Sequence, residues 1–217
     1  DKPNQGYGTT CNRGIDEAHG QWIAIVEPDD WIKPGMYKDM LDFVSGFDQQ
    51  PIDIVKTPYI RIQYPDTDRQ RSYQCSYHNR IRPTQQPFTI EDPGVVDILS
   101  HHPSIWSAIY RKGFLDAKGV RFRPIPGAGW ADNPFLIDSM CQADRIVYFD
   151  IPYYCYRENT PEQDYAFTMR NPTLPFDRWQ DMQDELDKLG AHDEGIQRVH
   201  NSRGFTYLSG VIEVVPL

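Results

Sequence analysis

The chain has 217 residues, of which 39% are apolar and 13% aromatic, so it can bury the core of one sizeable domain, with or without an appendage. Its net charge of −9 and isoelectric point of about 5.1 argue against a general nucleic-acid binder, which needs a basic face. No apolar run approaches the roughly 20 residues of a membrane span, and four cysteines without a CxxC pair favour reduced thiols in an intracellular protein.

The N-terminal part of the chain predicts a loop, a helix and a strand. A glycine-rich turn over 4–8 precedes a helical pattern over 9–19. Residues 22–26 form an unbroken, largely β-branched apolar run, which predicts a strand buried on both faces, as in the middle of a parallel sheet. Pro28 cannot donate to a strand ladder, so the strand should end near Glu27. Because the chain opens on a loop without a preceding strand, we expect a fragment or a partly ordered chain.

An acidic turn follows this strand and contains Glu27, Asp29 and Asp30. Open α/β sheets bind ligands at the carboxyl ends of their strands. Three neighbouring carboxylates repel one another unless a positive charge lies among them. A hard divalent cation that also carries a phosphate would satisfy them. The alternative is an ordinary acidic turn that contains proline.

The rest of the chain mixes helical and extended patterns. The helical patterns cover 35–45, 95–99, 111–117, 133–143, 176–189 and 193–214. The extended patterns cover 52–55, 59–64, 71–77, 104–110, 145–149 and 152–157. Polar turn residues over 65–68 predict a hairpin between the second and third of these strands. Residues 78–95 are rich in proline, glutamine and arginine and predict a surface loop, and residues 158–175 form a long polar segment with three prolines. Strands mixed with helices predict an α/β fold that ends in a helical appendage.

Three blocks of sequence resemble a known family. They are residues 4–37, residues 102–115, and Trp-Ala-Asp-Asn-Pro-Phe over 130–135, which is followed by Pro-Tyr-Tyr-Cys-Tyr-Arg over 152–157. Together they resemble the family 2 glycosyltransferases of the GT-A fold, which are inverting and use nucleotide-sugar donors. The resemblance implies a GT-A-like (Rossmann-like) mixed sheet flanked by helices. It divides the chain into a partial GT-A domain over 1–160 and a helical C-terminal extension over 161–217.

The resemblance also implies roles for the acidic residues. Glu27 and Asp29 stand where the family has its Asp-x-Asp metal motif, so Asp29 is expected to hold Mn²⁺ or Mg²⁺ on the donor diphosphate. Glu27 keeps the charge of the motif's first aspartate but is longer by one methylene, and it is expected as the second metal ligand. Asp30 is expected to contact the donor or support the loop. Asp132 matches the catalytic base, although Ala131 replaces the acidic residue that often precedes it in the family.

The physical chemistry of inverting transfer agrees with this assignment. One group must take a proton from an acceptor hydroxyl, which suits the lone carboxylate of Asp132. Another must stabilise the leaving nucleoside diphosphate, which suits a divalent cation. Asp132 also lies just before a helical pattern, so the alternative for this residue is a plain helix N-cap.

Weaker candidates each have a structural alternative. The resemblance places Asn12 beside the donor site, although Cys11 replaces the arginine that commonly precedes it. Trp106 and Trp130 flank the presumed sugar site and could stack on a sugar ring, but buried tryptophans also serve as core. We interpret His101, His102, His192 and His200 as mainly structural. We interpret the arginines as a solvated face, with an anionic acceptor as the alternative: Arg61, Arg69, Arg71, Arg80 and Arg82.

The sequence therefore predicts an enzyme that moves a sugar from a nucleotide-sugar donor to a glycan or lipid-linked acceptor in surface-polysaccharide synthesis. We expect a cytoplasmic protein, at most peripherally bound to the inner face of a membrane, with no nucleic-acid partner. The family's usual first unit, which reads the nucleotide, is missing from the residues at hand. This absence leaves a non-catalytic carbohydrate-binding or scaffolding relative as the alternative. A phosphohydrolase is disfavoured, because Asp30 and Trp31 follow Asp29 where an aspartyl-phosphate motif needs other residues.

Overall fold

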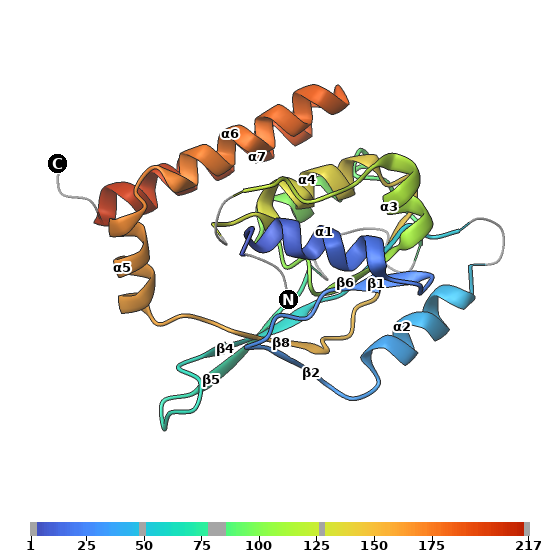
Figure 1. Cartoon of the computed structure of the whole chain (residues 1–217), viewed down its shortest axis with the longest axis horizontal. Helices are drawn as coiled ribbons and strands as arrows, with labels where there is room; N and C mark the ends of the chain where they lie inside the picture. The colour runs from blue at the N-terminus through green and yellow to red at the C-terminus, as the bar shows by residue number, and fades with distance from the viewer. Residues whose placement is uncertain (1–3, 48–50, 78–85, 126–128, 215–217) are drawn as a thin grey trace.

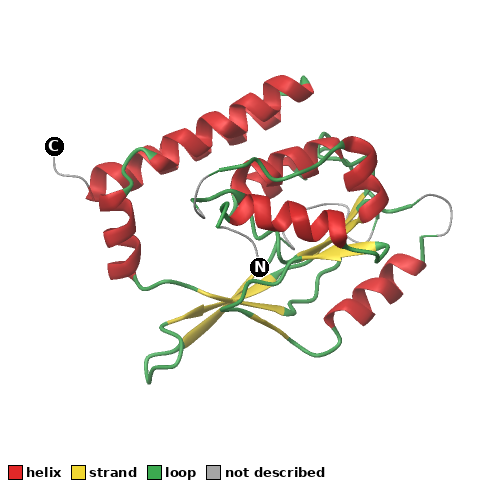
Figure 2. Cartoon of the chain, in the orientation of Figure 1, coloured by secondary structure: helices red, strands yellow, loops and turns green. Residues whose placement is uncertain are grey.

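A computed structural model describes residues 4–47, 51–77, 86–125 and 129–214. Its strands are β1 (Trp22–Ala24), β2 (Trp31–Ile32), β3 (Ile54–Lys56), β4 (Tyr59–Gln63), β5 (Arg71–Cys75), β6 (Ala108–Arg111), β7 (Ile146–Tyr148) and β8 (Tyr154–Arg157). Its helices are α1 (Tyr7–Glu17), α2 (Met36–Ser45), the 3₁₀ helix η1 (Val96–Ser100), α3 (Lys112–Lys118), α4 (Asp132–Gln142), α5 (Pro161–Arg170), α6 (Leu174–Leu189) and α7 (Glu194–Val214). The fold is thus the mixed α/β arrangement that the sequence predicts (Figures 1 and 2).

The strands form two mixed four-stranded sheets. The first has the order β1-β6-β3-β7, with only β3 and β7 parallel. The second has the order β2-β8-β4-β5, with only β8 and β4 parallel. The predicted hairpin is confirmed as the antiparallel pair β4 and β5, in which Tyr59 faces Cys75 and Gln63 faces Arg71.

The prediction for residues 22–26 is wrong in one respect. Within the described residues, β1 pairs only with β6, in antiparallel orientation, and so lies at an edge of its sheet. Of the three residues of β1 only Ile23 is buried, and Val26 beyond its end is 48% exposed. An unbroken apolar run was therefore not evidence that both faces of the strand are covered.

The core lies between the first sheet and the helices that cover it. Figure 1 shows α1, α3 and α4 over this sheet, and α6 and α7 beyond α4. Residues 133–140 of α4 are all buried, because the sheet covers one side of the helix and α6 packs against the other. Met182 of α6 and Ile196 of α7 belong to the same apolar cluster as the strands. The predicted boundary at residue 160 falls between β8 and α5, and the later helices α6 and α7 share the core of the preceding residues.

Residues 158–175, described from the sequence as a long polar segment, contain the helix α5. Its start is fixed by a capping box, in which Thr160 Oγ1 accepts a hydrogen bond from Gln163 N–H at 3.4 Å and Thr160 N–H donates to Gln163 Oε1 at 2.8 Å. Pro161 at the first helical position adds a second start signal. Both start signals lie in the sequence Thr-Pro-Glu-Gln over 160–163.

The segment 78–95 also differs from its prediction as a surface loop. Residues 78–85 lie outside the described residues. In the described remainder, Phe88 pairs with Ile146 beside β7, and Phe88, Ile90 and Val95 are buried. This part of the segment belongs to the core.

All four cysteines are described, and none of them forms a disulfide. Among the described helices, none combines the length and the apolar character that crossing a membrane requires.

Candidate active site

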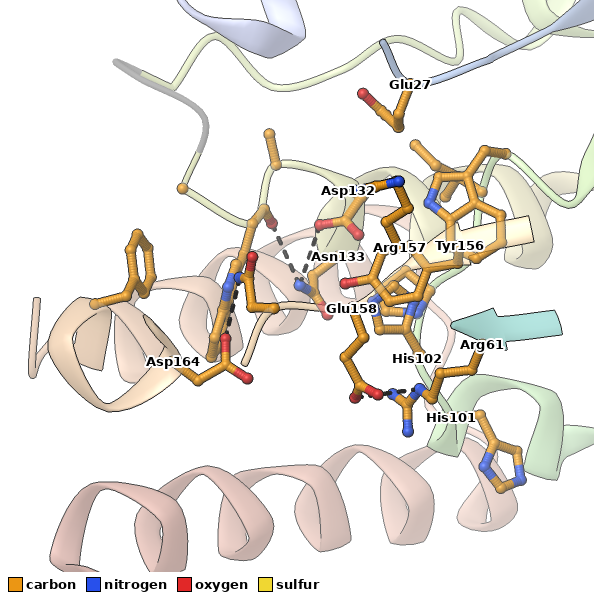
Figure 3. A pocket seen from close by; sticks show the side chains of 18 of the residues that line it. Glu27, Arg61, His101, His102, Asp132, Asn133, Tyr156, Arg157, Glu158 and Asp164 are labelled. Atoms are coloured by element: carbon orange, nitrogen blue, oxygen red, sulfur yellow. Dashed lines mark hydrogen bonds and ion pairs between the residues drawn. The ribbon is translucent and has the colours of Figure 1, made fainter. Parts of the chain in front are cut away.

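A cleft of about 790 Å³ opens where several separate segments meet. Its walls come from the acidic loop after β1, the 100–106 loop after η1, the first turn of α4, the strand β8 and the helices α5 and α7. Figure 3 shows Glu27 and Asp132 apart from each other in this cleft, with Arg157 and Tyr156 beside Asp132. The cleft thus gathers residues more than 100 positions apart in the chain.

The acidic loop is held in place by β8. Asp30 accepts a hydrogen bond from Tyr154 Oη at 2.8 Å and one from Arg157 N–H at 2.7 Å, so both of its carboxylate oxygens are occupied. The N–H of Glu27 donates to the same Tyr154 hydroxyl at 3.0 Å. Asp30 therefore supports the loop, which is one of the two roles predicted for it.

Glu27 lines the cleft, and one of its two carboxylate oxygens already accepts a hydrogen bond. The hydroxyl of Tyr7, at the start of α1, donates a hydrogen bond to Glu27 Oε1. Burial raises the pKa of Glu27, and the charges of Asp30, Asp132 and Asp29 raise it further, against the hydrogen bond from Tyr7, which lowers it. These carboxylates form a mutually repelling group around one opening, as the sequence predicts.

Asp29 differs from its two acidic neighbours. Its side chain is exposed, and among the described residues it has no hydrogen bond or ion pair. The described residues contain no cluster of three His, Cys, Asp or Glu side chains that could hold a metal alone. A free carboxylate at Asp29 with Glu27 nearby fits a cation that takes most of its ligands from a diphosphate and water, as Mg²⁺ often does.

Asp132 is the first residue of α4, and it is not the N-cap that the structural alternative required. The N-cap is Ala131, and its side chain makes no capping hydrogen bond. Burial raises the pKa of Asp132 to about 6, while its own N–H, the charge of Arg203 and the N–H of Asn133 act in the opposite direction. A carboxylate with this pKa is ionised near neutral pH and can still accept a proton.

A buried polar network lies directly behind Asp132. Asn133 Nδ2 donates to Trp130 O at 3.3 Å and approaches Asp132 Oδ1 at 3.4 Å. Asn133 Oδ1 accepts from Arg203 Nη1 at 3.1 Å and from Tyr207 Oη at 3.0 Å. This network connects α7 to the first turn of α4.

The two tryptophans line the cleft in different ways. Trp106 is only 3% exposed and stacks on Tyr154, with ring centroids 4.2 Å apart, so most of it is core. Trp130 has a left-handed backbone with φ of 54°, which is uncommon for a bulky residue, and its ring lies 5.4 Å from that of Tyr207. Trp130 is therefore the more accessible candidate for stacking on a sugar.

Asn12 has no place in the cleft. Its amide nitrogen donates to Phe122 O at 2.8 Å, and its amide oxygen accepts from Phe122 N–H at 2.7 Å. Both ends of the side chain are thus used to join α1 to the segment before α4. The geometry supports the structural alternative for Asn12, and a donor contact there stays a prediction.

The loop that carries Trp106 is fastened by a buried lysine that the sequence analysis did not single out. Lys56 Nζ donates to Ser104 O at 2.5 Å, to Ser104 Oγ at 2.8 Å and to Ser107 Oγ at 3.0 Å. Burial lowers the pKa of Lys56 to about 7. Ser104 has a φ of 38°, so the lysine holds a strained turn.

His102 and His200 behave as structural residues. His102 Nδ1 accepts a hydrogen bond from Ser104 N–H at 3.0 Å, and burial lowers its pKa to about 3, so the ring is neutral. His200 stacks on Trp179 inside the helical region, away from the cleft residues. Both observations agree with the structural interpretation.

Two arginines that line the cleft form ion pairs with carboxylates. Arg61 pairs with Glu158 at 3.3 Å, and Arg157 pairs with Asp66 at 2.5 Å. Arg80 and Arg82 lie outside the described residues. These pairings give no support to the anionic acceptor that was the alternative for the arginines.

Several residues that line the cleft were not predicted from the sequence to have a functional role. Among the residues that line the opening without a predicted role are Tyr7, Tyr156, Asp164, Arg203 and Tyr207. Three of them lie on α5 and α7, whose approach to α4 is a matter of tertiary packing. Tyr7 and Tyr156 belong to blocks that resemble the family, but the resemblance gave neither of them a role.

The sequence of the chain is similar to those of known glycosyltransferases. The sequence profile described as "Glycosyl transferase family 2" matches residues 1–116. The curated "Putative glycosyltransferase EpsH" of Bacillus subtilis (strain 168) is 27% identical over 156 residues, which cover 71% of this chain and 42% of the relative. The "Uncharacterized glycosyltransferase EpsJ" of the same organism is 25% identical over 163 residues, covering 72% of this chain and 43% of the relative.

Solved structures give a similar result for the fold. The crystal structure of S. aureus TarS 1–349 in complex with UDP-GlcNAc has a TM-score of 0.55 and 16% identity, and the match covers all of this chain and 64% of that one. The chain described here spans less than half the length of the two curated relatives that it matches.

Proposed function

The chain belongs to glycosyltransferase family 2 and has the GT-A fold, and from this premise we propose that its cleft transfers a sugar, with inversion, from a nucleotide-sugar donor to an acceptor hydroxyl. One observation carries the proposal. Asp29 and Asp132, about 100 residues apart in the chain, line the same cleft. Nothing in the local sequence forces them together, and the proposed reaction needs one carboxylate on the donor side and one on the acceptor side.

On the donor side, Asp29 is the carboxylate that remains available. We propose that it holds Mn²⁺ or Mg²⁺, with Glu27 as a second oxygen donor at longer reach. When bound, such a cation supplies positive charge to the leaving diphosphate. The complex of TarS with UDP-GlcNAc supports a nucleotide-sugar donor for this fold.

On the acceptor side, Asp132 acts as the general base in our proposal. Its carboxylate takes the proton of the acceptor hydroxyl as the acceptor oxygen bonds to the anomeric carbon. The bond from that carbon to the diphosphate breaks, and its electrons leave with the diphosphate oxygen. A single displacement of this kind inverts the anomeric centre. Asn133 and Arg203 favour the ionised form of Asp132, which is the form that can accept the proton.

The acceptor is a glycan or a lipid-linked glycan in this proposal, within cell-surface polysaccharide synthesis. A second hollow of about 480 Å³ shares Glu158, Asn159, Asp164 and Thr168 with the main cleft, so the opening continues past Asp132. An acceptor longer than one sugar would have room there. The four free cysteines agree with a cytoplasmic location, and we propose at most peripheral contact with the membrane.

The test is release of UDP by the full-length protein from a panel of UDP-sugars, with Mn²⁺ and with water or a glycan as acceptor. We expect metal-dependent release, and proton NMR of the first product formed should show the inverted anomer. No release from any donor of the panel, together with retained binding of free glycans, would favour the non-catalytic relative that the departures at Glu27 and Ala131 suggest.

A further inference from the structure

We propose that Arg203 of α7 is a positioning residue for the general base, because it fixes the side chain of Asn133 and places a buried, unpaired positive charge behind Asp132. The inference rests on the proposed function, in which Asp132 is the general base. It assigns a part of the catalytic arrangement to the C-terminal helices, which the sequence analysis treated as an appendage.

Arg203 is deeply buried for a charged residue, with 7% of its surface exposed. Its Nη2 donates to Leu99 O and, at 2.7 Å, to His101 O, while Nη1 donates to Asn133 Oδ1 at 3.1 Å and to Tyr207 Oη at 3.3 Å. Its Nε has no partner among the described residues. Arg203 thus joins α7, the loop after η1 and the first turn of α4 at one point.

All of these acceptors are neutral. No carboxylate in the described part of the chain forms an ion pair with Arg203, so its charge is not cancelled at close range. A buried charge of this kind is costly unless an opposite charge lies nearby. Asp132 is the carboxyl group whose pKa the charge of Arg203 lowers, and this makes the pair functionally linked without direct contact.

The hydrogen bonds also fix the orientation of Asn133. An amide has one accepting end and one donating end. Because Arg203 and Tyr207 both donate to Asn133 Oδ1, the Nδ2 end must point the other way, toward Trp130 O and Asp132 Oδ1. A donor aimed at a carboxylate favours its ionised form. Arg203 therefore acts on Asp132 twice, through its charge and through Asn133.

The other groups near Asp132 do not replace this effect. Glu27, from the loop after β1, is a like charge and opposes ionisation of Asp132. Tyr110 of β6 and Tyr207 of α7 feel the charge of Asp132, and both have raised pKa values, so they are neutral. Arg203 is the cation that acts on Asp132 within the described residues.

The test measures the titration of Asp132 directly, by carbon-13 NMR of labelled aspartate carboxyls in the full-length protein, with Asp132→Asn to assign the signal. Arg203→Gln keeps N–H donors for the carbonyls and removes the charge. We expect the pKa of Asp132 to rise by about one unit or more. In Arg203→Lys, which keeps the charge, the pKa of Asp132 should stay close to its value in the wild type. Arg198→Gln, on an exposed position of the same helix, is the matched control and should leave the titration unchanged.

In Arg203→Gln the acid limb of the pH–rate profile for UDP-sugar hydrolysis should shift to higher pH, by as much as the pKa of Asp132 rises in the NMR titration. At a fixed pH on that limb, a rise of about one unit lowers turnover about tenfold. An unchanged Asp132 titration in folded Arg203→Gln overturns the inference. If that variant does not fold, Asn133→Ser removes the amide donor instead, and a titration unchanged by it overturns the inference as well. Because the NMR reading needs no turnover, an inactive wild-type protein would refute the proposed function alone.

Discussion

The hydroxyl of Tyr154 donates a hydrogen bond to Asp30 Oδ2 at 2.8 Å, although the two residues are 124 positions apart in the chain. The same hydroxyl accepts the N–H of Glu27 at 3.0 Å, so one side chain of β8 binds the acidic loop at two points. Tyr154 is completely buried, and this makes it a fixed support. Hydrogen bonds to β8 therefore fix the conformation of the loop, and the carboxylate of Asp29 stays available to bind a ligand.

Replacing Tyr154 by phenylalanine should weaken donor binding without unfolding the protein. The change removes two hydrogen bonds to the loop, each with a net value of about 0.5–1.5 kcal/mol, so we expect a loss of about tenfold in metal-dependent affinity for UDP. Isothermal titration with UDP and Mn²⁺ measures it. Tyr73→Phe, at an exposed position on β5, is the control. Equal affinities in the two variants would contradict the supporting role of Tyr154.

Asp29→Asn should abolish the effect of Mn²⁺ on UDP affinity. The amide keeps the shape of the side chain but removes the charge that a hard cation requires. The measurement is UDP titration with and without Mn²⁺. Asp42→Asn, whose carboxylate pairs with Lys38 on α2 outside the cleft, should behave as the wild type. If Asp29→Asn binds UDP and Mn²⁺ as tightly as the wild type, and EDTA is harmless, the metal proposal fails.

Lys56→Met should destabilise the fold. The substitution keeps most of the volume but leaves buried serine oxygens without their donor, which costs about 1–3 kcal/mol. Urea unfolding followed by circular dichroism gives the free energy of unfolding. Lys38→Met, at an exposed position, should change it little. If Lys56→Met were as stable as the control, the turn at Ser104 would not depend on the hydrogen bonds from Lys56.

The parts of the fold that sequence could predict are those with strong local signals. The hairpin of β4 and β5 follows from two alternating segments around a polar turn, and α6 follows from a clear apolar stripe. The acidic loop was recognisable because Glu27, Asp29 and Asp30 lie together in the chain. Asp132 was found only through the family resemblance, since an aspartate before a helix is ordinarily a cap.

The parts that sequence missed depend on long-range packing. Nothing near Val26 indicates that β1 lies at the edge of its sheet, because an apolar run looks the same at an edge and in the centre. Nothing near Lys56 marks its role, which exists only because the 100–106 loop folds over β3. Arg203 lies 70 positions from Asn133, and no local pattern connects them.

The raised pKa of Asp132 predicts how stability depends on pH. The folded-state pKa is about 6 and the ordinary value is 3.8, so the folded state holds this proton more tightly. The resulting stabilisation is fully present below about pH 3.8 and is lost as the pH rises through about 6. Asp132→Asn removes this dependence, so its melting temperature at pH 8 should equal or exceed that of the wild type. A clear decrease at pH 8 would mean that the carboxylate stabilises the fold.

The central claim is that Asp132 is the base of a sugar transfer in the cleft that it shares with Asp29. The most direct measurement is the turnover of Asp132→Asn with a UDP-sugar and Mn²⁺, beside Asp144→Asn, an exposed aspartate just beyond the end of α4. We predict that Asp132→Asn binds UDP and Mn²⁺ normally but loses at least about a hundredfold in turnover, the low end of what a positioned base contributes. Asp144→Asn should keep the wild-type rate. Turnover by Asp132→Asn at the wild-type rate would contradict the account.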